Sequence, residues 1–420
     1  LNIFSNLKLR VGWGQTGNSG SATSLSVNQV SPDRIMFYYL NGGNYVSGAG
    51  LAKVAEIDTN LKWETNEQTN IGLDLGFFDN SLNITLDYFV RDAKDLLLYR
   101  NLRPSTGYTS IYTNAGHIRN SGFEFAINYT KEIGDWTFGA TLNGSTLKNK
   151  AIEVGDDIFH SGGVDDGYYW TNYSITKNGH PVGSFYGHKV VGIFQNQSEI
   201  DALNKQAAEK TNGEITVYQT AETKPGDWKY IDVNGDGYIS DEDKTILGDG
   251  YPTLNYGLNL TAGYKGWDFT LYMYGVLGQD ILSYSYANLT SVYAASGGYQ
   301  NCLADCMKNA WTPENQSSKY TRLTRTDGNH NVRISDAFIK NGDFLRISNI
   351  QIGYTFPKKW VKPLRMESAR VYVSVENLAT ITGYKYGDPE VGDSNVLRTG
   401  FDAGRYPFPR TYAFGLSVQF

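Results

Sequence analysis

Residues 81–92 read Ser-Leu-Asn-Ile-Thr-Leu-Asp-Tyr-Phe-Val-Arg-Asp, and this stretch decides the fold class. Every second residue from Leu82 to Val90 is apolar or aromatic: Leu82, Ile84, Leu86, Tyr88 and Val90. Polar side chains stand between or beside them at Asn83, Thr85, Asp87 and Arg91. Successive side chains of a β-strand point to opposite faces of the sheet. The stretch therefore predicts a strand with one apolar and one polar face.

The same alternation recurs along the chain and predicts about ten strands of roughly 10 to 13 residues. They lie near residues 5–14, 66–77, 81–92, 118–130, 136–147, 254–264, 267–277, 343–356, 369–379 and 410–420. This length exceeds the usual strand of a soluble protein and matches a tilted strand that crosses a membrane. No stretch has the roughly 18 consecutive apolar residues of a transmembrane helix.

The predicted connections alternate between short and long. Residues 79–80, 131–135 and 265–266 form tight turns, whereas 15–65, 93–117, 148–253, 278–342 and 380–409 are long. Short turns on one side and long loops on the other are typical of outer-membrane barrels. We therefore predict an all-β protein, a transmembrane antiparallel β-barrel with long extracellular loops. A soluble β-sandwich also alternates and is the alternative fold.

Composition and charge limit the partners. The 420 residues carry a net charge of −6 without a run of Lys or Arg, so nucleic acid is not an expected partner. Cys302 and Cys306 are the two cysteines, and the sequence leaves open whether they form a disulfide.

No constellation of catalytic residues is visible, so we expect a protein without enzymatic activity. The five histidines lack zinc-site spacing, and no Gly-x-Ser-x-Gly motif occurs. Asp388-Pro389-Glu390 pairs two carboxylates, but the intervening proline favours a structural turn over acid–base chemistry.

Residues 232–243, Asp-Val-Asn-Gly-Asp-Gly-Tyr-Ile-Ser-Asp-Glu-Asp, follow the spacing of an EF-hand calcium loop. The expected ligands are the side chains of Asp232, Asn234, Asp236, Ser240 and Asp243 and the carbonyl oxygen of Tyr238. Asp243 stands where an EF-hand has glutamate. The sequence predicts bound calcium in an extracellular loop, and a polar turn without metal is the alternative.

Aromatic residues in the long loops are the candidate substrate contacts: Tyr168, Tyr169, Trp170, Tyr173 and Trp228. Aromatic rings stack on the apolar faces of sugars, which favours glycan binding. Packing within the loops, or contact with a partner protein, is the alternative. In the same region, residues 198–210 predict a helix with Ser198 as its N-cap.

Several blocks resemble, in order, the SusC/RagA family of TonB-dependent outer-membrane transporters of Bacteroidetes. They are residues 7–18 (LKLRVGWGQTGN), 114–124 (NAGHIRNSGFE), 192–195 (GIFQ), 232–237 (DVNGDG), 251–258 (YPTLNYGL), 382–390 (TGYKYGDPE) and the terminal strand 412–420 (YAFGLSVQF). The resemblance covers essentially the whole chain.

The resemblance implies a nutrient importer whose loops face the extracellular side of the outer membrane. Such transporters have a plug inside a barrel of about twenty-two strands, a TonB-box segment that couples to TonB, and a SusD-like surface lipoprotein as a lid. Residues 1–420 are then expected to be the C-terminal part of the barrel, without plug or N-terminal strands. Glycans are the expected substrate. A peptide importer, a passive porin or adhesin, and a secreted glycosidase or carbohydrate-binding module are the alternatives.

Overall fold

The computed structural model describes residues 4–19, 30–41, 44–53, 56–58, 60–108, 110–160, 170–294, 298–316, 319–392 and 395–420. Most described elements are strands, and within these ranges no helix is long and apolar enough to cross a membrane.

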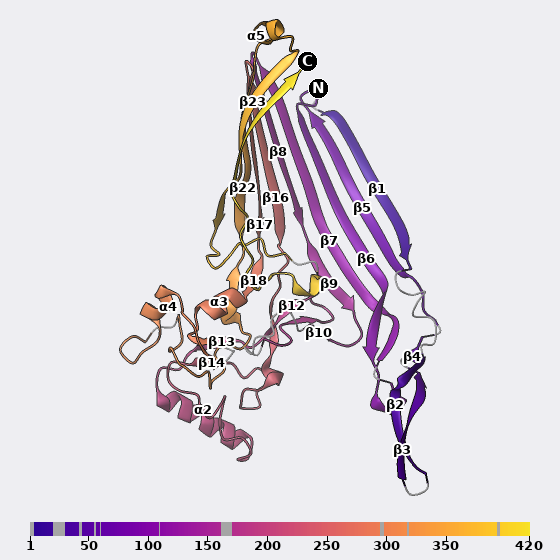
Figure 1. Cartoon of the computed structure of the whole chain (residues 1–420), viewed down its shortest axis with the longest axis vertical. Coiled ribbons are helices and arrows are strands. Elements are labelled where there is room, and N and C mark those ends of the chain that lie inside the picture. The colour runs from indigo at the N-terminus through magenta and orange to yellow at the C-terminus, as the bar shows by residue number, and fades with distance from the viewer. Residues whose placement is uncertain are drawn as a thin grey trace.

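One long antiparallel sheet, called the wall below, dominates the molecule (Figure 1). Its ten main strands pair in chain order: β1 (Phe4–Asn18), β5 (Glu64–Phe77), β6 (Leu82–Asn101), β7 (Ser110–Ile133), β8 (Trp136–Thr146), β16 (Leu254–Tyr264), β17 (Trp267–Leu277), β22 (Phe344–Thr355), β23 (Ser368–Thr382) and β25 (Thr411–Gln419). Two short strands, β4 (Glu56–Ile57) and β9 (Lys148–Glu153), pair with β7. The ten predicted strands and the all-β barrel fold are confirmed.

The strand register collects the alternating apolar residues on one face of the wall. Ile84 pairs with Leu75 on one side and with Ile127 on the other. Farther along, Leu260 pairs with Ala140 and with Leu271. The rows continue to the last strand, where Phe414 pairs with Val373, and the opposite face carries Asp, Glu, Arg, Asn, Thr, Ser, Gly and Tyr. In a barrel, the apolar face contacts lipid and the polar face lines the lumen.

The tight turns gather at one end of the wall, near α5 (Lys358–Val361) and both chain ends (Figure 1). Aromatic rings on the apolar face form a row there: Trp136 stacks on Tyr264 at 4.2 Å, and Trp267 lies 4.9 Å from Tyr354 between ring centroids. Such a band of amphipathic rings is typical of a membrane–water interface.

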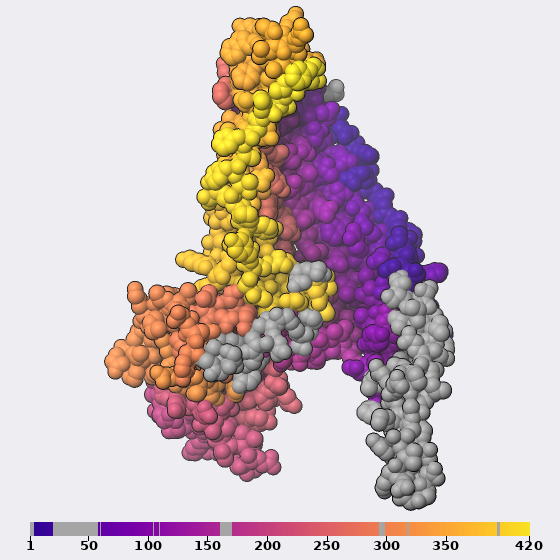
Figure 2. Space-filling view, in the orientation of Figure 1, coloured from indigo at the N-terminus to yellow at the C-terminus, as the bar shows by residue number. Residues whose placement is uncertain are grey.

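The long loops form a folded mass at the other end, called the loop layer (Figures 1 and 2). Its strands are β10 (Ile158–His160), β11 (Ser174–Thr176), β12 (Ser184–Gly187), β13 (Val190–Ile193), β14 (Trp228–Tyr230), β15 (Thr245–Gly248), β18 (Asp280–Ser283), β19 (Tyr293–Ala294), β20 (Gly298–Tyr299), β21 (Ile339–Asn341) and β24 (Phe401–Asp402). Its α-helices are α2 (Gln197–Lys210), α3 (Tyr284–Leu289) and α4 (Ala304–Asn309), and its 3-10 helices are Asp241–Asp243, Asp336–Phe338 and Val396–Arg398. Elsewhere lie the hairpin of β2 (Val30–Asn41) and β3 (Asn44–Lys53) and the 3-10 helices Pro104–Thr106 and Lys362–Leu364.

The loop layer corrects the predicted N-cap of one helix and settles the state of the two cysteines. Helix α2 begins at Gln197, and its N-cap is Asn196, whose side chain accepts the Glu199 N–H. The predicted cap Ser198 is wrong because it lies inside the helix. Cys302 and Cys306 are not bridged, and Cys306 is buried.

Candidate functional site

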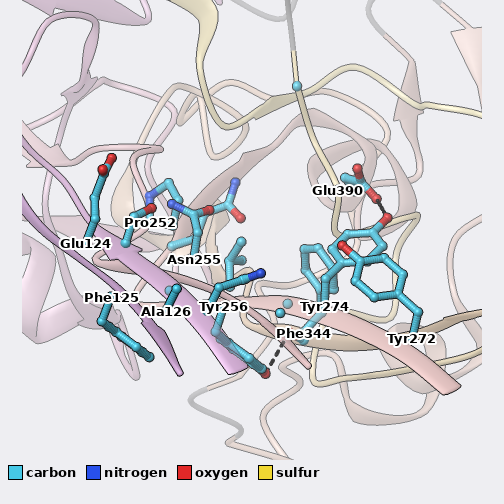
Figure 3. Close-up of a pocket in the computed structure, with 18 of the residues that line it drawn as sticks. Glu124, Phe125, Ala126, Pro252, Asn255, Tyr256, Tyr272, Tyr274, Phe344 and Glu390 are labelled. Carbon is cyan, nitrogen blue, oxygen red and sulfur yellow. Dashed lines mark hydrogen bonds between the residues drawn. The ribbon is translucent and has the colours of Figure 1, made fainter. Parts of the chain in front are cut away.

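A cavity of about 720 Å³ lies between the polar face of the wall and the loop layer. Residues of β6, β7, β8, β16 and β17 form its floor, and residues from three loops form its rim (Figure 3). The polar and aromatic lining residues are Thr85, Asp87, Glu124, Phe125, Asn143, Ser145, Asn255, Tyr256, Tyr272, Tyr274, Gln279, Phe344, Glu390 and Thr399. Among the described residues that line this cavity, none is Lys or Arg.

Tyr272 and Tyr274 are site residues that the sequence analysis missed. They occupy the polar phase of β17, whereas Phe269, Leu271 and Met273 occupy its apolar phase. The two tyrosine rings stack with centroids 6.0 Å apart. An aromatic residue in the polar phase of a barrel strand was the signal that could have identified them, since the ring must then face the lumen.

A charged row crosses the polar face beside the cavity. The Arg10 guanidinium donates to Asp74 Oδ2 at 2.8 Å and to Asp87 Oδ1 at 2.9 Å. Gly72 lies between these partners, and a Cβ there would come within 2.7 Å of Arg10 Cζ. Glycine at this position therefore lets one arginine cross β5 and hold two carboxylates.

The next residue in the same row is Glu124, which pairs across the strands with Asp87. No described residue donates to or ion-pairs with the Glu124 carboxylate, and Figure 3 shows it at the cavity. The cavity therefore offers hydrogen-bond acceptors, hydroxyl groups, amides and tyrosine rings.

Three of the predicted aromatic contacts, Trp170, Tyr173 and Trp228, lie outside the lining of this cavity. Trp170 is 2% exposed and donates from Nε1 to the Val332 carbonyl at 2.7 Å, and Tyr173 is 0% exposed and stacks on Phe401. Both belong to the largest hydrophobic core of the loop layer, and Trp228 packs beside a second core. Tyr168 and Tyr169 lie outside the described residues.

These positions fit the packing alternative. A ring buried on both faces has no surface for a ligand, so Trp170 and Tyr173 stabilise the loop layer in this conformation. A role for the five aromatics in substrate contact stays a prediction.

The predicted calcium ligands lie in one tight loop whose carboxylates bind backbone N–H groups. Asp232 accepts from Gly235 N and Gly237 N, and the buried Asp243 accepts from Val233 N and Ser240 N. Lys210 Nζ lies 3.6 Å from Asp232 Oδ2. Over the described part of the chain, no three His, Cys, Asp or Glu side chains gather closely enough to hold a metal ion.

Buried polar groups hold the loop layer together. Asp227, 0% exposed, pairs with Arg322 at 2.7 Å and accepts from Asn331 Nδ2 at 2.9 Å. His188 lies beside Tyr230, and burial, together with the nearby charges of Arg333 and Lys244, lowers its pKa to about 3. His188 is therefore neutral in the folded protein at neutral pH.

Comparison with known proteins points to one family. The family described as "TonB dependent receptor-like, beta-barrel" matches residues 2–378. The chain is 32% identical to TonB-dependent receptor P3 of Formosa agariphila and 29% identical to TonB-dependent receptor SusC of Bacteroides thetaiotaomicron. All of this chain aligns with each, but with only 40% of the first and 38% of the second.

Solved structures give the same architecture. The whole chain superposes on 41% of a chain of the RagAB peptide importer in its open-open state, with a TM-score of 0.74 and 22% identity. Another structure of the RagAB peptide transporter matches with a TM-score of 0.71. At this identity the match establishes the fold.

Proposed function

This chain belongs to the family of TonB-dependent receptor-like β-barrels, and on that premise we propose that it forms wall and outer loops of a SusC-type importer that takes up glycans. The relatives include SusC of Bacteroides thetaiotaomicron, and the chain spans about 40% of their length. The activity of the whole transporter is therefore part of the proposal.

The cavity between the wall and the loop layer is the observation that carries the choice of substrate. Its lining combines the exposed ring of Tyr272 and the partly buried ring of Tyr274 with Asn, Gln, Ser and Thr side chains. Sugar rings present apolar faces that stack on aromatic rings, and their hydroxyl groups pair with amides, hydroxyls and carboxylates. A cavity of about 720 Å³ is of the size that buries a ligand of several rings.

Peptide import is the second candidate. The RagAB structures with the same fold are named as a peptide transporter, and the acidic side chains of the cavity would suit a cationic peptide. A passive porin or an adhesin has less support, because the family is one of TonB-dependent receptors.

The proposed setting is the bacterial outer membrane, with the loop layer on the extracellular side. There the loop layer would face a SusD-like lipoprotein, and TonB would supply the work through a plug inside the barrel. The apolar face of the wall and the aromatic row at its turn end support a lipid-embedded barrel.

Growth and binding together test the substrate. We expect deletion of the gene in its own bacterium to abolish growth on at least one of starch, xylan or levan oligosaccharides and to leave growth on peptides unchanged. The purified transporter should bind the same oligosaccharide. Loss of growth on peptides alone would favour peptide import instead.

We also propose that residues 232–243 bind calcium. The spacing of Asp232, Asn234, Asp236, Ser240 and Asp243 supports this, with the carbonyl of Tyr238 as a further ligand. Without the ion, backbone N–H groups and Lys210 satisfy the carboxylates. Calcium would compete with these donors and rigidify the loop.

Calcium binding is tested by titrating the purified protein and following proteolysis of residues 148–253. The expected result is protection by calcium that disappears in Asp232→Ala with Asp236→Ala, while Glu209→Ala, on the exposed face of α2, keeps it. Equal cleavage with calcium and with chelator would exclude the site.

A further inference from the structure

The Asp388-Pro389-Glu390 segment of the cavity rim divides into two roles. Asp388 is 8% exposed, and both of its oxygens are occupied. Its Oδ1 accepts from Arg346 Nη2 at 2.5 Å and from Glu390 N at 3.0 Å, and its Oδ2 accepts from Phe408 N at 3.3 Å. Asp388 therefore fastens the segment to the wall, as the interpretation of a structural turn requires.

Glu390 differs because only one of its oxygens is used. Its Oε2 accepts from the Tyr274 hydroxyl at 2.7 Å and lies 3.0 Å from Arg346 Nη1. No described residue donates to Oε1, and the side chain is 38% exposed and lines the cavity. The Tyr274 hydrogen bond orients the carboxylate, the Arg346 guanidinium adds an ion pair on the same oxygen, and the other oxygen is left as an acceptor.

Arg346 is the residue that makes this arrangement rigid. It projects from the polar face of β22 and is 2% exposed, and its guanidinium reaches both Asp388 and Glu390. Its Nε donates to Thr380 Oγ1 of β23 at 3.1 Å. A planar guanidinium with several fixed partners holds two carboxylates in a way that a lysine ammonium does not.

An aromatic surface lies next to the acceptor. Tyr272, 40% exposed, stacks at 29° on Tyr274, whose hydroxyl holds Glu390. Figure 3 shows the two rings side by side with Glu390 above Tyr274. A flat apolar ring beside a fixed carboxylate oxygen matches the two sides of a sugar, its apolar face and its hydroxyl edge.

We propose that Tyr272 and Glu390 form a sugar subsite, in which a neutral sugar ring stacks on Tyr272 and donates a hydroxyl hydrogen bond to Glu390 Oε1. Arg346 is its positioning residue. The inference rests on the proposed glycan import and names the atoms that would recognise the sugar.

The test measures binding of maltohexaose, xylohexaose and a levan hexasaccharide to the purified transporter by calorimetry. Glu390→Gln keeps an acceptor for Tyr274 but replaces the free acceptor with an amide donor. We expect its affinity to fall about tenfold or more, as for loss of a hydrogen bond to a charged group. Tyr272→Ala should weaken binding similarly, whereas Tyr299→Ala, an exposed ring in a loop outside the cavity lining, should not.

A double-mutant cycle separates a contact from a structural effect. We expect one monodeoxy derivative of the bound hexasaccharide to bind wild type more weakly than the parent sugar does. In Glu390→Gln the same derivative should bind as tightly as the parent sugar, because the hydrogen bond is already lost. Arg346→Lys should reduce this coupling, while the folded, heat-modifiable fraction and loop proteolysis stay as in wild type.

The outcomes distinguish the two hypotheses. If wild type binds none of the three hexasaccharides, the proposed glycan import fails. If wild type binds one but Glu390→Gln and Tyr272→Ala bind it equally well, or no deoxy position couples to Glu390, the subsite is wrong. Tighter binding of chitosan hexamer through its ammonium groups would contradict the proposal that the ligand is a neutral sugar. If the coupling between the hydroxyl and Glu390 is unchanged in Arg346→Lys, Arg346 is not a positioning residue.

Discussion

The wall exposes its large apolar side chains, whereas the loop layer buries them. In the wall, large apolar side chains point outward, and Phe414 of β25 is 83% exposed. In the loop layer, Trp170, Tyr173 and Tyr230 are almost completely covered. Such a large exposed apolar surface is rare in soluble proteins. One chain therefore contains a part built for lipid and a part built for water.

The two parts also differ in what stabilises them. Between its edge strands β1 and β25, ladder hydrogen bonds link each strand of the wall to its neighbours, and a membrane makes such bonds obligatory. The loop layer depends on hydrophobic clusters and buried polar pairs that join distant segments. Substitutions in one part should therefore leave the other folded.

The largest expected effect is on the loop layer. Asp227→Ala leaves the Arg322 guanidinium without its buried partner and should destabilise this layer by about 3–5 kcal/mol. Limited proteolysis of residues 148–253 should accelerate, while the barrel keeps its heat-modifiable migration. Glu209→Ala, on an exposed part of α2, is the control. Loss of the folded barrel in Asp227→Ala would contradict the independence of the two parts.

The second effect concerns the lipid face. Leu260→Arg at the middle of β16 should cost about 2–4 kcal/mol in a bilayer. Thr261→Arg, the next residue, points to the polar face and should cost much less. Urea unfolding of the protein in lipid vesicles measures both. Equal costs would mean that the assignment of the two faces is wrong.

Sequence periodicity predicted the wall well for a physical reason. A strand with one face in lipid must alternate, so each strand carries its own signal, and all ten predicted segments overlap observed strands. The signals for the turns are also local, because a turn is encoded in its own residues. Lys265 and Gly266 have φ of 47° and 91°, as a two-residue hairpin needs.

The loop layer has no such signal because its contacts are remote. Trp170 binds Val332, 162 residues away, and Asp227 binds Arg322, 95 residues away. Nothing local to Trp170 or Tyr173 therefore signals that these two loop aromatics pack in a core. In the site, Glu390 was interpreted as part of a turn, and only the fold shows that Tyr274 and Arg346 hold it at the cavity.

The third effect is a pH dependence of the loop layer that the wall does not share. Burial lowers the pKa of His188 from 6.5 to about 3, so the unfolded loop layer binds a proton more readily than the folded one. Stability is fully present above pH 6.5 and falls below it by about 1.4 kcal/mol per pH unit, or about 2 kcal/mol by pH 5. Arg333, Lys244 and Asp241 are the charged neighbours.

Proteolysis of the loop layer at pH 7.5 and pH 5 measures this effect, with an acid-tolerant protease calibrated on an unfolded substrate. His188→Gln should flatten the pH dependence, and His180→Gln, an exposed histidine, should leave it unchanged. A wild-type loop layer equally resistant at both pH values would mean that His188 is not held neutral by the fold.

The smallest effect should come from the turn end of the wall. Gly266 has φ of +91°, and a Cβ there would lie 2.7 Å from the Thr355 carbonyl oxygen. Gly134, in the neighbouring turn, has φ of +59° with open space around it. Alanine in the left-handed region costs about 1–2 kcal/mol, so Gly134→Ala should cost about 1 kcal/mol and Gly266→Ala more, because its Cβ must displace the strand of Thr355. Urea midpoints in vesicles compare the two variants, and loop proteolysis should be unaffected in both. If Gly134→Ala proved the more damaging, the close packing of the β16–β17 turn against β22 would not limit stability there.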